Sequence, residues 1–134
     1  MDLAVVKVGQ RGTTRVIVAA EHTAARVGSG VIAVLATPVM INLIEAAALD
    51  ACESLLPAGH QTLGTHLDVS HTAATPVGGL VTAVAEVVAV RGREIDFVVE
   101  VRDDLEVVGK GRHTRVAVNV DKFEARVKRK ADAL

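Results

Sequence analysis

The sequence predicts an α+β fold in which an antiparallel sheet wraps around one long helix. Three observations support this prediction: a single long apolar segment begins with a helix signal, several strand-like segments are joined by short turns, and strands do not alternate with helices as they do in a doubly wound fold. The chain has 134 residues, which is the size of one domain. We therefore predict a single domain over residues 1–134.

The strands are expected where β-branched residues recur or where apolar and polar residues alternate. The first is expected over residues 13–20 and is followed by a small-residue connection, a loop or lid ending at Gly28-Ser29-Gly30. After the helix, strands are expected over residues 61–73, 80–90, 95–102 and 105–120. Gly109 and Gly111 in the last strand indicate a bulge or a close approach of another backbone.

The helix is expected to run from Thr37 to about Leu55. Thr37 is suited to cap the first amides, Pro38 suits the first turn, and Pro57-Ala58-Gly59 ends the helix. Apolar residues cover most of its circumference, which is typical of a buried helix rather than a surface one. It is the one helix that the sequence predicts.

Composition argues against two classes of partner. Half of the residues are hydrophobic, yet there is no Trp or Tyr and there are only two Phe, so the core must be built from Val, Ala, Leu and Ile. Fifteen Lys and Arg against sixteen Asp and Glu give a net charge of −1, which supplies no field to attract nucleic acid or an anionic membrane. Aromatic platforms for base stacking are also scarce. We therefore predict no nucleic-acid partner and no membrane partner.

The same composition bears on location and assembly. The apolar run over residues 31–44 is too short to span a membrane, and the start of the chain lacks the pattern of a secretory signal. The single cysteine, Cys52, cannot form an internal disulfide and is expected to serve packing. We predict a cytoplasmic protein, and an obligate oligomer, because a small monomer this hydrophobic would expose a large apolar patch.

Two ionisable residues stand among apolar neighbours. Glu45 lies inside the apolar helix, where it is either a functional carboxylate or part of a ragged polar strip that reaches solvent. His71 shares the apolar face of its expected strand with Leu67 and Val69, so it should point toward the helix. A lone inward histidine is usually a satisfied core residue, but a carboxylate and an imidazole that face each other suit a general base and its orienting partner.

Thr37 is the third candidate. Helix capping explains it by itself, but its hydroxyl would also lie at the amino end of a long helix, where free amides favour a developing negative charge. One residue can fill both roles.

Other patterns are weaker. His66 and Asp68 cannot join His71 in a metal site, because a regular strand sends them to the opposite face, and we predict no metal. The run Gly109-Lys110-Gly111-Arg112 lacks the spacing of a phosphate loop. The basic segment over residues 122–130, with a C-terminal tail from about residue 124, is either a solvated end or a holder of a phosphorylated ligand.

Several of these residues together resemble the hot-dog-fold thioesterases, and among them the fluoroacetyl-CoA thioesterases. The likeness runs from about Val8 to Lys130 and includes the Glu45 helix. Its most specific parts are Leu63-Gly64-Thr65, the run Val-Ser-His-Thr-Ala-Ala-Thr-Pro over residues 69–76, and the run over residues 109–115 with Lys122-Phe123. The lid is the least similar part: aromatic residues are expected between residues 25 and 36, where Val31, Ile32, Val34 and Leu35 stand instead.

The resemblance implies a curved sheet that clasps the long helix and continues into the sheet of a second subunit. It implies a homodimer, with a tetramer as a further assembly, and hydrolysis of an acyl-CoA with a small or medium acyl group near the dimer interface. The family's catalytic residues correspond to Thr37, Glu45 and His71, and its pocket residues to Gly64 and Arg115. No cofactor or metal is implied, because CoA is part of the substrate.

Two other functions fit the same features. The chain could be a non-enzymatic acyl-CoA-binding or structural oligomer, in which Glu45 and His71 form a buried structural pair. It could also be an enoyl-CoA hydratase, which adds water and leaves the thioester intact. Loss of turnover without loss of assembly on replacing His71 separates an enzyme from a structural pair, and release of thiol separates hydrolysis from hydration.

Overall fold

The structure is a computed structural model that describes residues 3–134. Residues 1 and 2, the first two of the predicted domain, lie outside the described residues. Five strands form one sheet in the order β1-β3-β4-β5-β2, and every neighbouring pair is antiparallel. Their bounds are β1 Arg11–Ile17, β2 His60–His71, β3 Leu80–Arg91, β4 Glu94–Arg102 and β5 Val107–Asn119.

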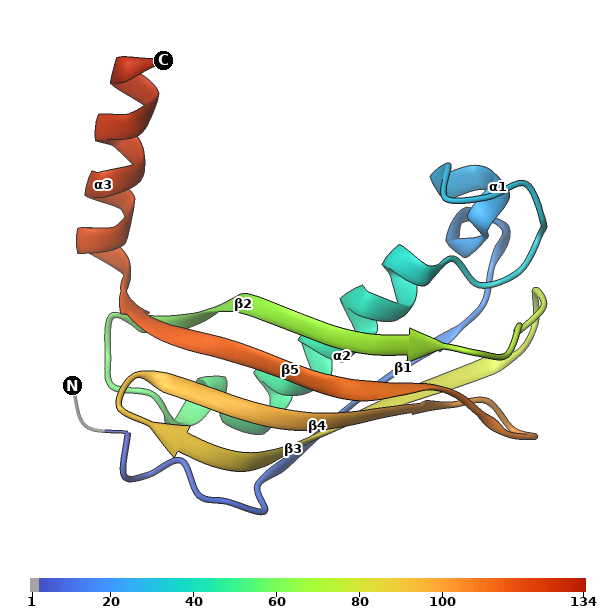
Figure 1. Ribbon diagram of the computed structural model, residues 1–134, viewed down its shortest axis with the longest axis horizontal. Helices are drawn as coiled ribbons and strands as arrows, with labels where there is room; N and C mark the ends of the chain where they lie inside the picture. Colours follow the sequence, from blue (N-terminus) through green and yellow to red (C-terminus); the bar gives the residue numbers. More distant parts are fainter. Residues whose placement is uncertain (1–2) are drawn as a thin grey trace.

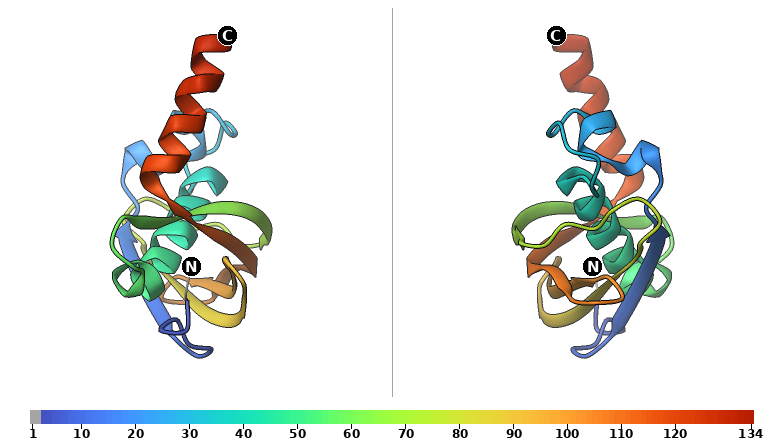
Figure 2. Two further views of the ribbon diagram at one scale, coloured as in Figure 1. Left: turned by 90° about the vertical axis from the view of Figure 1, so that its left-hand side faces the viewer. Right: turned by 90° about the vertical axis from the view of Figure 1, so that its right-hand side faces the viewer.

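The long helix α2, Thr37–Cys52, lies in the hollow of this sheet (Figures 1 and 2). A 3-10 turn, Glu53–Leu55, continues it to the predicted end. The predicted α+β fold, a sheet wrapped about one helix, is confirmed. None of the helices in the described part of the chain is long and apolar enough to cross a membrane.

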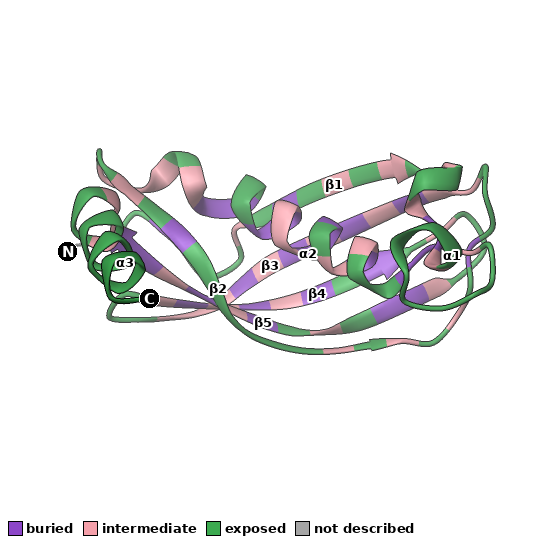
Figure 3. Cartoon of the chain, turned by 90° about the horizontal axis from the view of Figure 1, so that it is seen from above, coloured by how far each residue is buried: buried purple, intermediate pink, exposed green. Residues whose placement is uncertain are grey.

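The core lies between α2 and the sheet. α2 packs chiefly against β1 and β3, which leaves the hollow above β5 and β2 open. The side of α2 that faces the sheet is buried and its other side is not, so the predicted buried helix is buried on one side only (Figure 3). As predicted, the buried side chains are mostly aliphatic; the largest fully buried ones include Phe97, Leu35, Met40, Ile44, Ile95 and His113.

The C-terminal segment corrects a second prediction. Residues Val120–Ala133 form a helix, α3, instead of only a basic tail, and Asn119 caps it by accepting a hydrogen bond from the Lys122 amide. A short helix, α1, Ala24–Val27, also forms within the expected lid, after a 3-10 turn at Ala20–His22. α3 projects beyond the β2 edge of the sheet, at the end of the molecule opposite α1 (Figure 1).

A bulge in β2 corrects the expected alternation. The pairing with β5 shifts between Gly64 and His66, so Thr65 is an extra residue in this strand. Gly64 pairs with Arg115 before the bulge, and His71 pairs with Gly109 after it. Because cross-strand partners share a face, the even-numbered residues face α2 before the bulge and the odd-numbered ones face it afterwards. Gly64 and His71 therefore share the inner face, which strict alternation would have forbidden.

The expected close approach in β5 is confirmed. A side chain on Gly111 would collide with the Asp68 carbonyl of β2, and one on Gly109 would lie 2.6 Å from the Met40 sulfur and 2.8 Å from the Ser70 carbonyl. These two glycines let β2 and α2 approach the β5 backbone.

Candidate active site

Thr37 and His71 meet at the amino end of α2. The Thr37 hydroxyl lies 2.7 Å from Nδ1 of His71, which is the last residue of β2. The helix cap is Ala36, and no side chain caps this end, so the capping role predicted for Thr37 is wrong. Its hydroxyl instead forms a hydrogen bond with an imidazole, as in a nucleophile and its base.

The two lie beside a cavity of about 290 Å³ between α2 and the lid. Val34 and Leu35 of the lid contribute to its wall; the other lining residues are Ala24, Ser29, Thr37, His71, Thr72, Ala73 and Ala74. A larger cavity, of about 680 Å³, is lined by residues of all five strands, among them Arg11, Glu86 and Arg112, and contains none of the candidate catalytic residues.

His71 is set up to act as a base. Burial lowers the pKa of its imidazole, and the backbone of Ala73 opposes this shift. Its Nε2 is buried and has no hydrogen-bond partner among residues 3–134. A lowered pKa keeps the ring neutral near pH 7, and a neutral ring with Nε2 protonated accepts the Thr37 proton on Nδ1.

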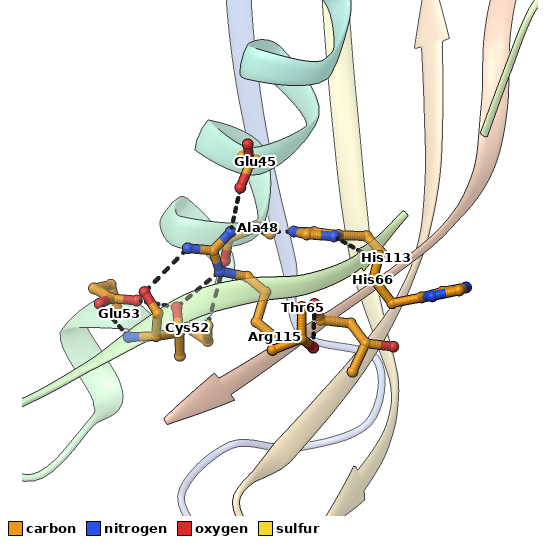
Figure 4. A network of polar contacts seen from close by, with 10 residues as sticks. Glu45, Ala48, Cys52, Glu53, Thr65, His66, His113 and Arg115 are labelled. Carbon is orange, nitrogen blue, oxygen red and sulfur yellow. Dashed lines mark hydrogen bonds and ion pairs between the residues drawn. The ribbon is translucent and has the colours of Figure 1, made fainter. Parts of the chain in front are cut away.

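Glu45 belongs to a second group of side chains (Figure 4). Its Oε2 accepts a hydrogen bond of 3.1 Å from the Arg115 guanidinium, and its side chain is 37% exposed. The Arg115 side chain is only 5% exposed and also donates to the Thr62 hydroxyl at 2.8 Å, to the Thr62 carbonyl at 3.1 Å and to His113 Nε2 at 3.1 Å. Glu53 completes the group, because its carboxylate accepts hydrogen bonds from the amide and hydroxyl of Thr62, both at 2.8 Å.

Gly64 is in contact with this second group. A Cβ at Gly64 would lie 2.8 Å from Glu45 Oε2 and 3.0 Å from His113 Cε1. The predicted pocket residues Gly64 and Arg115 therefore both lie against the Glu45 carboxylate, and a side chain at position 64 would displace the carboxylate from its present position.

His113 is a residue that the sequence did not single out. It is fully buried, stacks on Phe97 with ring centroids 6.2 Å apart, and its Nδ1 donates to the His66 carbonyl at 2.8 Å, since Nε2 accepts from Arg115. Burial lowers the pKa of His113, and the Arg115 charge acts in the same direction. Its two-residue spacing from Arg115 on one strand face is the signal that would have revealed it.

The structure does not bring the two groups together within one subunit. Eight residues of α2 separate Thr37 from Glu45, a rise of about 12 Å, and the Glu45 carboxylate pairs with Arg115 instead of His71. The predicted direct pairing of a buried carboxylate with the imidazole is therefore wrong for one chain. Thr37, Ile41 and Glu45 nevertheless follow one another at four-residue intervals along one side of α2.

Comparison with known proteins identifies the class. The sequence model of the fluoroacetyl-CoA-specific thioesterases matches residues 7–121. The fluoroacetyl-CoA thioesterase of Streptantibioticus cattleyicolor is 40% identical over 100 residues, which are 75% of this chain and 72% of that protein.

Solved structures agree. A fluoroacetyl-CoA thioesterase superimposes with a TM-score of 0.87 at 35% identity, over 92% of this chain and 96% of that one. A Thermus thermophilus protein of the thioesterase superfamily gives 0.87 at 25% identity, over 96% and 98% of the two chains. The fold is thus that of the hot-dog thioesterases. The chain belongs to the family of fluoroacetyl-CoA-specific thioesterases.

Proposed function

We propose that this chain hydrolyses acyl-CoA thioesters with a small or medium acyl group, releasing the free acid and CoA. The observation that carries the proposal is the 2.7 Å contact between the Thr37 hydroxyl and His71 Nδ1, beside a cavity of about 290 Å³. A hydroxyl, a neutral base and a helix amino end are the groups that acyl transfer requires. The small residues and lid aliphatics that line the cavity suit a short acyl chain.

In the proposed reaction His71 first accepts a proton and later returns it. The proton comes from Thr37, which attacks the thioester carbonyl, or from a water that Thr37 holds. In the first turn of α2 the amides of Val39 and Met40 donate to the Ala36 carbonyl and Pro38 has no amide hydrogen, so the Thr37 amide is the one that faces the developing oxyanion. The carbon–sulfur bond then breaks, and His71 returns the proton to the sulfur, which leaves as free CoA. On the route in which Thr37 attacks, the acyl group stays on the Thr37 oxygen until a water, deprotonated by His71, hydrolyses this ester, releases the free acid and restores the Thr37 hydroxyl. No cofactor or metal is needed, because a thiolate is a good leaving group.

We propose that the site is completed by a second subunit. β2 is an edge strand with Leu63 and Leu67 about 40% and 38% exposed, and the hollow beside it is open. If two β2 edges pair as antiparallel strands, the two-fold axis is perpendicular to the sheet, so both long helices lie on the same side. The second group of side chains in one subunit, which includes Glu45 and Arg115, then approaches Thr37 and His71 of the other subunit.

This arrangement supports the role proposed for Glu45. Arg115 and Gly64 hold the carboxylate on the open side of α2, where it can polarise water or orient the imidazole of the facing subunit. Thr37 and Glu45 of one subunit lie about 12 Å apart along α2, but in this dimer each would act with a residue of the other subunit. A tetramer and a cytoplasmic location remain predictions.

The test is a thiol-release assay over a panel of acyl-CoAs of increasing chain length. We expect thiol release to be fastest with short chains, and His71→Ala to lower kcat by about 10²–10⁴-fold, the usual contribution of a general base. The variant should keep its thermal unfolding midpoint and its assembly, since His71 is only partly buried. No thiol release from any acyl-CoA would contradict the proposal, and loss of enoyl-CoA absorbance without thiol release would indicate a hydratase.

Thr37→Ala and Thr37→Ser separate the two routes for the nucleophile. If Thr37 attacks, rapid quenching with mass spectrometry should find an acyl group on the Thr37 peptide, and the serine variant should retain activity. If Thr37 holds water, no acyl group should appear on the enzyme.

A further inference from the structure

A basic cavity lies where α3 leaves the sheet. It has a volume of about 370 Å³, and four of its lining residues are cations: Arg93, Lys122, Arg126 and Arg129. Val118, Asn119 and Ala125 complete the lining, so no carboxylate takes part in it. None of the four cations has an ion-pair partner among residues 3–134. The chain as a whole carries a net charge of −1, so this cluster is a local excess of positive charge.

Three of the cations lie close together on α3, and one of them also contacts an aromatic ring of the helix: the Arg126 guanidinium lies 5.6 Å from the centre of the Phe123 ring. Lys122, Arg126 and Arg129 follow one another by four and three residues, which places them on one side of α3. Like charges at this spacing destabilise a helix. The acidic residues of α3 do not line the cavity. The three side chains are exposed, and a bound anion would offset the repulsion between them.

The backbone favours an anion at the same place. Asn119 and Lys122 belong to the cap and the first turn of α3, where the positive end of the helix dipole lies. Arg93 comes from the turn between β3 and β4, and its backbone carbonyl accepts a hydrogen bond from the Ala117 amide, so the strand framework positions it beside the helix. The family model matches residues 7–121, so Lys122, Arg126 and Arg129 lie beyond the matched residues.

We propose that Arg93, Lys122, Arg126 and Arg129 bind the phosphate groups of the CoA part of the substrate. This inference rests on the proposed function and on its dimer. α3 rises from the end of the sheet where β2 begins at His60, and His71 lies at the other end of that strand (Figure 1). Antiparallel pairing of two β2 edges places the His60 end of one subunit's β2 beside the His71 end of its partner's β2. The basic cavity of one subunit then lies at the end of the dimer that holds the other subunit's Thr37 and His71.

The experiment compares an acyl-CoA with the same acyl group on pantetheine, which has no phosphate. In Arg129→Glu we expect KM for the acyl-CoA to rise about fivefold, as when an exposed charge contact is lost and replaced by repulsion, with kcat unchanged. KM for the acyl-pantetheine should not change. Lys130→Glu is the matched control: it makes the same charge change at the next position, which does not line the cavity, and should change neither value.

Three results would overturn the proposal. An equal change for both substrates would indicate a structural effect, and an equal effect of the Arg129 and Lys130 variants would indicate general surface charge. The third comes from titration calorimetry with adenosine 3′,5′-bisphosphate and with inorganic phosphate: equal affinity for both would show an unspecific anion site. If the wild type hydrolyses neither thioester, the proposed function fails, and the calorimetry still decides whether the cavity binds nucleotide phosphates.

Discussion

Two histidines with lowered pKa differ in what their nitrogens contact. His113 has both ring nitrogens engaged, one with the His66 carbonyl and one with Arg115. His71 has one nitrogen on the Thr37 hydroxyl and the other without a partner among residues 3–134. His113 therefore positions Arg115, and through it Glu45, whereas His71 is the histidine whose Nδ1 faces a hydroxyl that it can deprotonate.

The pH dependence of the reaction should reflect the protonation of the His71 imidazole. A base must be unprotonated, and burial lowers the pKa of His71 from its ordinary value of 6.5, so the base stays active at lower pH than a solvated histidine would. We expect kcat/KM to fall on the acid side with a midpoint below 6.5, measured by thiol release across a pH series. His60→Gln, a change at the start of β2, should leave this midpoint in place. A midpoint above 6.5 would contradict the assignment of His71 as the base.

At the scale of elements, close backbone contacts position α2. Gly12 of β1 is buried under the helix, and a Cβ at this position would collide with the Ala47 carbonyl and the Ala51 amide. The contact explains why α2 lies over β1 and β3, and so why its other side, with Glu45, remains open. The bulge at Thr65 has the complementary effect on β2, because it turns both Gly64 and His71 toward α2.

Gly12→Ala should therefore loosen the helix on the sheet. We expect it to lower the free energy of unfolding by about 2 kcal/mol, as overpacking at a rigid backbone contact does, measured by urea denaturation. The control is Thr13→Ala, at the neighbouring exposed residue, which should change the free energy by no more than about 0.5 kcal/mol. Equal stability of the two variants would show that the helix shifts at little cost.

At the scale of the whole molecule, one chain leaves part of the inner face of its sheet uncovered. The hollow of the sheet is covered by α2 on the β1 side only, the β2 edge is free, and the two groups of candidate catalytic side chains do not touch. α3 projects beyond the same edge (Figure 2). A second copy across β2 would cover the open hollow and bring the groups together.

Leu67→Lys tests this assembly. Leu67 pairs with His113 on the inner face of the edge strand and is 38% exposed, so a lysine there places a charge in the proposed interface. We expect the wild type to be a dimer by light scattering, and the variant to be a monomer that has lost thiol release. Val77→Lys, at a residue that is 52% exposed in the turn before β3, should remain an active dimer. A wild-type monomer with full activity would contradict the composite site.

The sequence by itself determined the elements and the candidate residues. Apolar periodicity, Gly and Pro turns and the Thr37-Pro38 start are local signals, and they placed α2 and the strands close to where they lie. The same local reasoning singled out Thr37, Glu45 and His71, while resemblance added Gly64 and Arg115. α3 was missed because its charges dominate its composition, although Val120, Phe123 and Val127 recur at helical spacing after the Asn119 cap.

Only the tertiary structure decided which of these residues meet. The Glu45–Arg115 ion pair joins residues 70 apart in the chain, and no local pattern encodes such a contact. Strict alternation predicted Gly64 and His71 on opposite faces of the strand. In the structure β2 has a bulge where it pairs with β5, and this bulge places both residues on the same face. The Thr37 hydroxyl, suited to cap its own helix, instead contacts His71 because the end of β2 lies beside it. Chain neighbours set the local conformation, whereas packing between distant segments sets the chemistry.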